Sequence, residues 1–509
     1  MDAIDLRHHL NTLSLSRSPS PLKDIINYMT IDGMLSLAGG LPHPSLFPFV
    51  NLEADVYAPT VDLNSDTREL VHLTVHRDDK NQGQVVDLAG ILQYTQVMGN
   101  SWLLQFTHEF MRTVFQPGYG NYETLLNEGN TDGWNKVVSL LCESGDCIII
   151  EKYTYSSAQA LWIPMGCKGV PIDMDEEGMR ADALEDVLQQ WDVKRPGEKR
   201  PHVLYTVPTG QNPTGCAMSA RRKQDIYSIC VKYDIIIVED DPYYFLQFEE
   251  YRRGRNRSAT PPKYDEPTFL RSLERTFLSF DTQGRVIRLD TFSKTLAPGN
   301  RLGWFTCNPL FAERLLRGAE VTTQAPSGWS QAIIAELLRS WGPGISGYLR
   351  WLSSLIKQYE VRRDWMCDAI ADAFDVEKGT DGEGLVAYSQ GIKLFSFVPA
   401  RAGMFLWCKM YLGEHRDYLE AKQNIREGED SEAIFETRIW KELLEEKVLL
   451  TPGSYYTPWQ GKDRKSIATS GREPDVVFFR LAFSMTTKED VVPAIQRMAK
   501  ALRLSWGIA

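Results

Sequence analysis

The feature that most constrains the fold is an alternation of short, apolar, β-branched segments with longer segments of helical periodicity, which begins near Gly129. Five short segments predict strands: Cys147–Glu151, Val203–Val207, Asp234–Glu239, Val286–Thr291 and Leu302–Cys307. Strands that alternate with helices favour a mainly parallel sheet covered by helices. Polar residues follow these strands at their carboxyl ends, which is where open α/β sheets place their ligands.

The remaining segments predict further helices and a second, smaller domain. The helix candidates are Trp134–Cys142, Ala220–Tyr233, Tyr348–Ala373 and Lys488–Leu504, and two later strands are expected near Gly403–Lys409 and Val476–Phe483. A chain of 509 residues exceeds one minimal core. We predict a large domain over residues 51–345 and a small α+β domain over 346–509, with residues 1–50 forming an N-terminal arm and part of the small domain. Four polar stretches are predicted to be exposed insertions: Asn64–Gln84, Lys194–Arg200, Glu249–Glu266 and Gly413–Glu432.

Charge and cysteine usage disfavour several classes of function. The formal net charge is −11, which argues against nucleic acid as a partner. The eight cysteines form no C-x-x-C pair, so reduced thiols are expected rather than disulfides or a metal site. The sequence shows neither a secretory signal nor an apolar run of membrane-spanning length, so we expect a cytoplasmic protein that does not enter a membrane.

The segment Asp290–Trp304 places one lysine among hydroxyl groups, with an arginine seven residues further on. Lys294 offers an amine that can form a Schiff base with an aldehyde. Thr291, Ser293 and Arg301 offer hydroxyl and guanidinium donors to a phosphate dianion. The alternative is a surface lysine in a turn rich in proline and glycine.

The residues around this lysine are in register with a known motif: Thr291, Ser293, Pro298, Gly299, Arg301 and Gly303. The segment resembles the lysine motif S-x-S-K-x-x-x-P-G-x-R-x-G of fold-type I pyridoxal-phosphate aminotransferases. That resemblance implies a mainly parallel seven-stranded sheet with helices on both faces, together with a smaller α+β domain. It also implies pyridoxal 5′-phosphate as the cofactor, held by Lys294.

A second match to the family follows the strand candidate Asp234–Glu239. A pyridine nitrogen that must stay protonated needs a carboxylate beside it. Asp241, with Tyr244 three residues further on, matches the family's ring-nitrogen partner and the phenol that contacts the ring hydroxyl. We interpret the adjacent Glu239 and Asp240 as structural acids.

Two turns resemble further parts of the cofactor site. Asn212, in an N-P-T-G turn, matches the amide that binds the cofactor's phenolic oxygen and contacts the substrate. Gly129 matches the glycine before a helix whose N-terminus binds phosphate. Asn130 and Thr131 would supply donors there, although most relatives carry small or amide residues directly after the glycine. A plain helix cap at Asn130 is the alternative.

Two tyrosines are assigned by the same resemblance. Tyr155 aligns with the aromatic residue that stacks on the pyridine ring, and it is counted with Lys294 and Asp241 among the catalytic residues. A buried structural tyrosine is the alternative. Tyr94 resembles the tyrosine that reaches the phosphate of a neighbouring subunit, which implies a homodimer with shared active sites.

The substrate is expected to meet an arginine and a glycine-rich loop. Arg480 stands in an apolar strand candidate and suits the α-carboxylate of an amino acid, unless it forms a permanent salt bridge. Gly39 and Gly40, in S-L-A-G-G-L-P, resemble a substrate loop that lets the backbone approach closely. The candidates for the side-chain pocket are Leu41, Tyr243, Tyr455, Tyr456 and Trp459.

Three segments narrow the resemblance: S-L-A-G-G-L-P, E-D-D-P-Y-Y-F-L-Q-F and G-M-F-L-W. They are similar to the aromatic amino acid, kynurenine and α-aminoadipate aminotransferases, and above all to the fungal-type members. The resemblance implies ping-pong transfer of an amino group from an aromatic amino acid to a 2-oxo acid such as 2-oxoglutarate, with Lys294 as the base. A kynurenine or α-aminoadipate aminotransferase, and a lyase or synthase of the same fold, remain alternatives.

Overall fold

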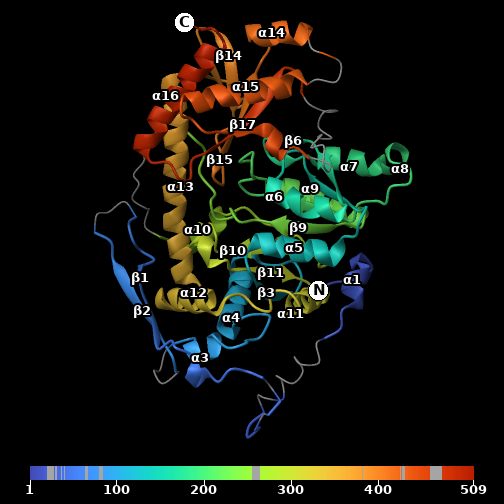
Figure 1. The fold of residues 1–509 in the computed structure, drawn as a ribbon, viewed down its shortest axis with the longest axis vertical. Coiled ribbons are helices and arrows are strands. Elements are labelled where there is room, and N and C mark those ends of the chain that lie inside the picture. Colours follow the sequence, from blue (N-terminus) through green and yellow to red (C-terminus); the bar gives the residue numbers. More distant parts are fainter. Residues whose placement is uncertain are drawn as a thin grey trace.

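The computed structural model contains two large β-sheets that lie one above the other beside a long helix, α13 (Ser346–Ala373) (Figure 1). It describes residues 1–19, 28, 31–35, 37, 38, 40–63, 67–78, 84–254, 264–380, 382–424, 426, 430–458 and 473–508. In that part of the chain, no helix is long and apolar enough to cross a membrane.

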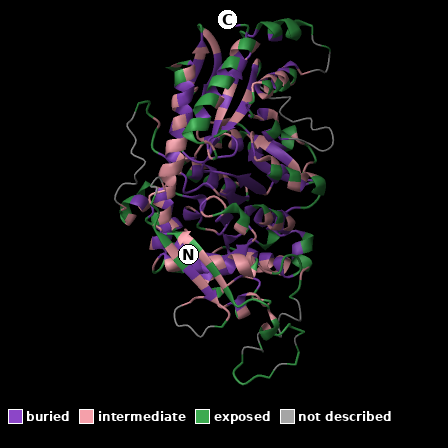
Figure 2. Cartoon of the chain, turned by 60° about the vertical axis from the view of Figure 1, so that its left-hand side comes forward, coloured by how far each residue is buried: buried purple, intermediate pink, exposed green. Residues whose placement is uncertain are grey.

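The larger sheet has seven strands, and all but one run parallel. Their order is β3 (Glu123–Asn127), β11 (Gly303–Cys307), β10 (Val286–Thr291), β9 (Ile236–Asp240), β8 (Val203–Thr206), β4 (Cys147–Glu151) and β5 (Lys168–Ile172). β11 is antiparallel to both of its neighbours. The central strands are apolar along most of their length and buried on both faces, as expected for a sheet covered by helices (Figure 2). The predicted fold class is therefore confirmed.

Two hydrophobic layers sandwich this sheet, and successive residues of a strand belong to different layers. In β9, Ile236 and Val238 pack in one layer, whereas Ile237 packs in the other. We call the layer of Val238, Tyr205 and Trp134 the front layer and that of Ile237 the back layer. The front layer includes α5 (Asn130–Leu141), and the back layer includes residues of α9 (Ala220–Lys232).

The smaller sheet is antiparallel throughout and has six strands. Their order is β12 (Asp375–Lys378), β13 (Leu385–Ser389), β14 (Ile392–Phe397), β15 (Phe405–Tyr411), β17 (Val476–Ala482) and β16 (Thr451–Pro452). α15 (Ser431–Glu445) and α16 (Lys488–Ser505) pack together beside it. Leu406, Cys408 and Met410 of β15 are buried, while Trp407 and Lys409 between them are partly exposed. One face of this sheet is therefore buried, and the other is partly exposed to solvent.

The N-terminal residues contact the larger sheet's helices. Asn11 precedes α1 (Thr12–Ser16), and its Nδ2 donates to the backbone oxygens of Ser139 and Cys142 at 2.9 and 2.8 Å. The sequence assigned these residues partly to the small domain, whereas their described hydrogen bonds include those of Asn11 with α5, of Ile4 with Gln283 and of His8 with Asp234. The contact with α5 forms because the amide of Asn11 satisfies the last carbonyl groups of that helix.

A β-hairpin lies within one of the stretches predicted to be exposed. β1 (Asn51–Tyr57) pairs with β2 (Leu70–His76), and Leu73 and Val75 are buried in the back layer together with Ala332 of α12 (Gly328–Ser340). The prediction of an exposed insertion over Asn64–Gln84 is therefore wrong for the strand β2. Alternating apolar residues inside this polar stretch were the missed signal.

The two sheets meet where two glycines touch. Gly210 follows β8 and has φ +61°, and Gly403 precedes β15 and has φ +80°. A Cβ on Gly403 would lie 2.6 Å from the backbone oxygen of Gly210, and a Cβ on Gly210 would lie 2.4 Å from Cα of Gly403. Both positions therefore require glycine, for backbone conformation and for space.

We predict that Gly403→Ala lowers the free energy of unfolding by roughly 2–5 kcal/mol, because a left-handed conformation and a steric overlap act together. Urea unfolding followed by circular dichroism measures this change. Gly413→Ala is the matched control, since its Cβ would meet no atom within 4 Å. Equal stabilities of the two variants would contradict the proposed contact.

Candidate active site

Lys294 lies just beyond the carboxyl end of β10, half-buried beside an aromatic ring. Its Nζ is 5.9 Å from the centre of the Tyr243 ring. Burial lowers the pKa of this amine, nearby Arg301 lowers it further, and Asp240 acts in the opposite direction. Among the described residues, none forms an ion pair with Lys294. The amine is therefore more easily deprotonated, and more nucleophilic, than that of an exposed lysine.

Asp240 is the carboxylate that faces Lys294 from the end of β9. The amide Nδ2 of Asn130 donates to Asp240 Oδ1 at 2.7 Å, and the Tyr205 hydroxyl donates to Oδ2 at 2.7 Å. Burial raises the pKa of this carboxyl group, while these two hydrogen bonds, Arg288 and Lys294 act to lower it. Its position follows from strand alternation, because Asp240 shares the front layer with Val238.

Asp241 and Tyr244 lie on the opposite side of the sheet from this carboxylate. Asp241 Oδ2 accepts hydrogen bonds from Thr209 Oγ1 and Arg288 Nη1, each at 3.2 Å. The Tyr244 hydroxyl donates to the backbone oxygen of Glu274 at 2.8 Å, and its ring is part of the back layer.

The geometry therefore corrects the register that the sequence predicted for this pair. It brings Asp240 and Tyr243 to Lys294, in place of Asp241 and Tyr244. Both pairs have the same spacing of three residues, so spacing could not distinguish them. The alternation of the buried strand would have done so, because Asp240 belongs to the face of Val238.

A cradle for an anion lies at the N-terminus of α5. The helix begins at Asn130 after Gly129, which has φ +89°. Arg301 Nη2 donates to the backbone oxygen of Glu128 at 3.0 Å, and Nη1 lies 3.4 Å from Ser293 Oγ. A Cβ on Gly129 would lie 2.7 Å from Arg301 Nη2, so glycine is needed for this approach. First-turn amides of a helix have no acceptor within the helix and bind anions readily.

Hydroxyl groups extend this cradle, but the Asn130 side chain does not. Thr291 Oγ1 donates to Ser293 Oγ at 2.9 Å, and Thr131 is exposed at the first turn of α5. The Asn130 amide is directed to Asp240 and to the backbone oxygen of Leu289. Asn130 can therefore contribute its backbone amide to an anion, while its side chain positions the carboxylate.

Arg480 of β17 joins the smaller sheet to the N-P-T-G turn. Its Nη1 donates to Asn212 Oδ1 at 2.7 Å, and its guanidinium carbon lies 4.4 Å from the centre of the Phe405 ring. Nε is buried and has no hydrogen-bond partner among the residues that the structure describes. Within the described ranges, no carboxylate forms an ion pair with Arg480. The alternative that Arg480 forms a permanent salt bridge therefore has no support among the described residues. The guanidinium remains suited to a ligand carboxylate.

The remaining predicted residues divide into two groups. Tyr155 is half-buried at the start of α6 (Ser156–Trp162), and it adds to the effect of burial in raising the pKa of Tyr243 and Tyr456. Tyr243 and Tyr456 are both buried. Arg480 lies near Tyr456, with 5.1 Å between the guanidinium carbon and the ring centre. Tyr243 therefore lies beside Lys294 and Tyr456 beside Arg480, and Tyr155 is close to both of these tyrosines.

The second group is exposed or lies outside the described residues. Tyr94 is 63% exposed, and Gly40 lies in an exposed segment where a Cβ would meet no atom within 4 Å. Leu41 and Tyr455 are also exposed. Gly39 and Trp459 lie outside the described residues. In the part of the chain that the structure describes, no contact joins Tyr94, Leu41 or Tyr455 to Lys294.

One described cluster has the chemistry of metal ligands. His8 Nε2 and His9 Nε2 lie 2.7 and 3.1 Å from the carboxylate of Asp234. Arg285 Nη1 lies 2.6 Å from the same carboxylate. Because this guanidinium already neutralises Asp234, we interpret the cluster as an anchor of the N-terminal arm.

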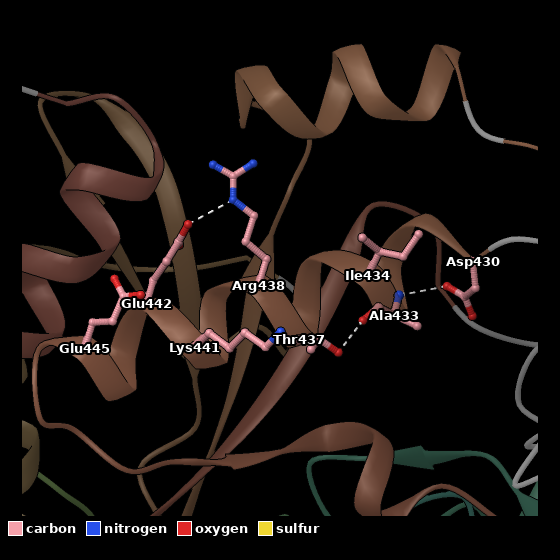
Figure 3. Close-up of a pocket in the computed structure, with 8 residues that line it drawn as sticks. All are labelled: Asp430, Ala433, Ile434, Thr437, Arg438, Lys441, Glu442 and Glu445. Atoms are coloured by element: carbon pink, nitrogen blue, oxygen red, sulfur yellow. Dashed lines mark hydrogen bonds and ion pairs between the residues drawn. The ribbon is translucent and has the colours of Figure 1, made fainter.

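A shallow groove elsewhere on the surface is formed by one helix, α15, and the residue that caps it (Figure 3). Its lining residues are Asp430, Ala433, Ile434, Thr437, Arg438, Lys441, Glu442 and Glu445. Arg438 Nε donates to Glu442 Oε1 at 2.9 Å within this groove. It contains none of the residues around Lys294, and its paired charges are those of a solvated helix face.

A nucleophilic amine next to an anion cradle suits an α/β enzyme whose cofactor carries both an aldehyde and a phosphate. Aminotransferases of class I and II are such enzymes. Their family model matches residues 91–496, and the chain belongs to this family. The family implies pyridoxal phosphate as the cofactor.

The chain resembles known aminotransferases along most of its length. It is 36% identical to an aromatic amino acid aminotransferase of Schizosaccharomyces pombe, over 98% of both chains. It is 34% identical to an L-tyrosine:2-oxoglutarate aminotransferase of Serpula lacrymans, over 89% of this chain and 84% of the relative. The solved structure of the aminotransferase Aro8 from Candida albicans superposes with a TM-score of 0.86 at 34% identity, with 99% of each chain covered.

We predict that the purified protein, loaded with pyridoxal phosphate, shows a visible absorption band that borohydride abolishes. Lys294→Ala should lose this band, and mass spectrometry should find the reduced cofactor on Lys294 in the parent protein. Lys152→Ala is a control, because Lys152 pairs with Asp173 away from the site. A reducible band that persists in Lys294→Ala would place the cofactor on another amine.

Proposed function

We propose that this aminotransferase transfers the amino group of an aromatic amino acid to a 2-oxo acid such as 2-oxoglutarate, with pyridoxal 5′-phosphate as its cofactor. The observation that carries the proposal is the arrangement of Lys294 and Asp240 on one face of the sheet, with Arg480 across the junction. The names of the two relatives support the aromatic donor and the 2-oxo acid acceptor.

The residues present fit this cofactor. Lys294 would hold its aldehyde carbon, and the first-turn amides of α5 with Ser293 and Arg301 would hold its phosphate. Gly129 supports this fit, because any side chain there would collide with Arg301. Thr291, Thr131 and Tyr155 would lie at the edge of the same space.

Asp240 would pair with the nitrogen of the cofactor's pyridine ring, and Tyr243 and Asn212 would contact the phenolic oxygen of that ring. When bound, the cofactor supplies a conjugated ring that withdraws electron density from the substrate's Cα–H bond. The amide of Asn130 and the hydroxyl of Tyr205 favour the ionised form of Asp240, against the rise in its pKa that burial causes. Lys294 is half-buried and has a lowered pKa, so its amine is suited to accept the proton from Cα and to donate it to a different atom.

Substrate binding is assigned to Arg480 and the tyrosines beside it. The guanidinium would bind the α-carboxylate through a bidentate pair, and Asn212 already fixes one of its nitrogens. Tyr243, Tyr456 and Phe405 offer aromatic surface near that arginine. An aromatic side chain is favoured because this surface carries few charges.

We further propose a homodimer in the cytoplasm, with residues 51–345 as the large domain and 346–509 as the small one. Tyr94, 63% exposed, and Leu35 and Leu37, both almost fully exposed, support a second subunit that would cover them. All eight cysteines are free thiols, which agrees with a reducing compartment. We also propose that Gly39 and Gly40 belong to a substrate loop.

The assignment of Asp240 is tested by comparing two isosteric variants. Asp240→Asn should lower kcat by roughly 10²-fold or more, because the ring nitrogen loses its ionic partner. Asp241→Asn should cost much less, since Asp241 lies on the back of the sheet. Single-turnover rates with a good amino donor measure both effects. A larger loss in Asp241→Asn, with both variants folded, would restore the register predicted from the sequence.

The substrate assignment predicts two results with a panel of amino donors. The kcat/KM values for phenylalanine, tyrosine and tryptophan should exceed that of α-aminoadipate, by the roughly 2–3 kcal/mol that burial of a ring contributes. Arg480→Ala should raise KM for amino acids and 2-oxo acids alike, and Arg480→Lys should do so less, because it keeps the charge but loses the fork. If kcat/KM for α-aminoadipate or kynurenine were well above that of phenylalanine, tyrosine and tryptophan, the proposed amino donor would be wrong, but the proposed transamination would stand.

A further inference from the structure

A buried ionic cluster lies directly behind Asp240, on the back face of the sheet. At its centre is Arg288 of β10, whose side chain is fully buried. Its Nη1 lies 3.1 Å from Glu239 Oε1 and 3.2 Å from Asp241 Oδ2, and its Nη2 lies 2.9 Å from Asp290 Oδ1. One guanidinium therefore binds three carboxylates, drawn from both the strand that bears Asp240 and the strand that leads to Lys294.

Strand register explains why these groups gather on one face. Arg288 pairs with Glu239 across β10 and β9, and Leu289 pairs with Asp240. Neighbours in register share a face, and the next pair lies on the opposite face. The ionic cluster around Arg288 and the carboxylate of Asp240 therefore lie on opposite faces of the sheet.

Aromatic rings seal the cluster from water. The guanidinium carbon of Arg288 lies 4.2 Å from the centre of the Phe115 ring and 5.1 Å from that of Tyr244. Lys223, also fully buried, donates from Nζ to the backbone oxygen of Arg275 at 2.8 Å and is the second cation nearby. In such an environment, each charge acts on its neighbours more strongly than it would in water.

Negative groups outnumber positive ones in this buried region. Its carboxylates are Glu239, Asp240, Asp241 and Asp290, and its cations are Arg288 and Lys223. Asp241 Oδ1 is buried, and no described residue forms a hydrogen bond with it. Burial raises the pKa of Asp241 to about 7 and that of Asp290 to about 6, and Arg288 acts against both shifts. Arg288 therefore favours the ionised forms of both carboxyl groups, and Lys223 acts in the same direction on Asp241.

We propose that Arg288 is a positioning residue for the reaction. It holds the three carboxylates of the back face, so that Asp240 is the one acid presented to the cofactor's ring nitrogen. The positive charge of Arg288 also sets the electrostatic potential at that nitrogen. This inference rests on the proposed function. Asp241, which directly follows Asp240 in the chain, belongs to the same cluster as one of the three carboxylates that Arg288 binds.

The test is a pH titration of the visible absorption band of the protein loaded with pyridoxal phosphate. The linkage between Lys294 and the cofactor is positively charged when it is protonated. Loss of a nearby positive charge therefore raises the pH midpoint of the band, and loss of a negative charge lowers it. Arg288→Gln should raise the midpoint by roughly one pH unit, Asp241→Asn should lower it, and the double variant should lie near the parent protein.

A purely structural role would not produce shifts of opposite sign that cancel. Arg363→Gln is the matched control, since Arg363 is a buried arginine paired with Asp364 in α13, and it should leave the midpoint unchanged. If Arg288→Gln does not fold, Asp241→Asn alone must still lower the midpoint. Shifts of the same sign in Arg288→Gln and Asp241→Asn, or an unmoved midpoint in folded Asp241→Asn, would overturn the inference. A parent protein without any such band would instead overturn the proposed cofactor.

Discussion

The opposite directions of neighbouring side chains in β9 are the constraint on which the rest of the site depends. Glu239 and Asp241 point to the back of the sheet, where Arg288 binds both, and Asp240 points to the front, where Asn130 and Tyr205 donate to it. A shift of one residue in register would bury two carboxylates in the front layer and leave Arg288 without most of its partners. The chemistry of Lys294 and the stability of the sheet are therefore fixed by the same hydrogen-bonded register.

The substrate side of the site depends on a second constraint, the close contact of the two sheets. Gly210 and Gly403 allow their backbones to touch, and a short distance away Arg480 of the smaller sheet donates to Asn212 of the larger one. Arg480 lacks a carboxylate partner among the described residues, so this part of the junction is polar and not fully satisfied. Unsatisfied buried donors are costly in a core, and they are common where a protein awaits a ligand.

Much of this architecture could be predicted from the sequence, because buried parallel strands are continuous apolar runs. β4 and β10 have the bounds that their apolar runs predicted, and Arg480 donates to Asn212 across the junction of the two sheets. Residue spacing could not decide between Asp240 and Asp241, because three consecutive acids precede two tyrosines. The alternation of side chains along β9 separates the two acids. The sequence also could not reveal the contact of Asn11 with α5, because that contact joins segments distant in the chain. The hairpin β1–β2 did leave a signal in the alternating apolar residues of β2.

Asn130 shows how these separate constraints act on one another. It is the first residue of α5, so its backbone amide belongs to the helix end that attracts an anion, while its side chain donates to Asp240. The positive end of the helix dipole stabilises negative charge at both places. An anion in the cradle and an ionised Asp240 would repel each other, and the helix end between them reduces that repulsion. A cofactor that brings a phosphate to one end of this space and a cationic ring nitrogen to the other would therefore complete a charge pattern that the protein alone leaves unbalanced.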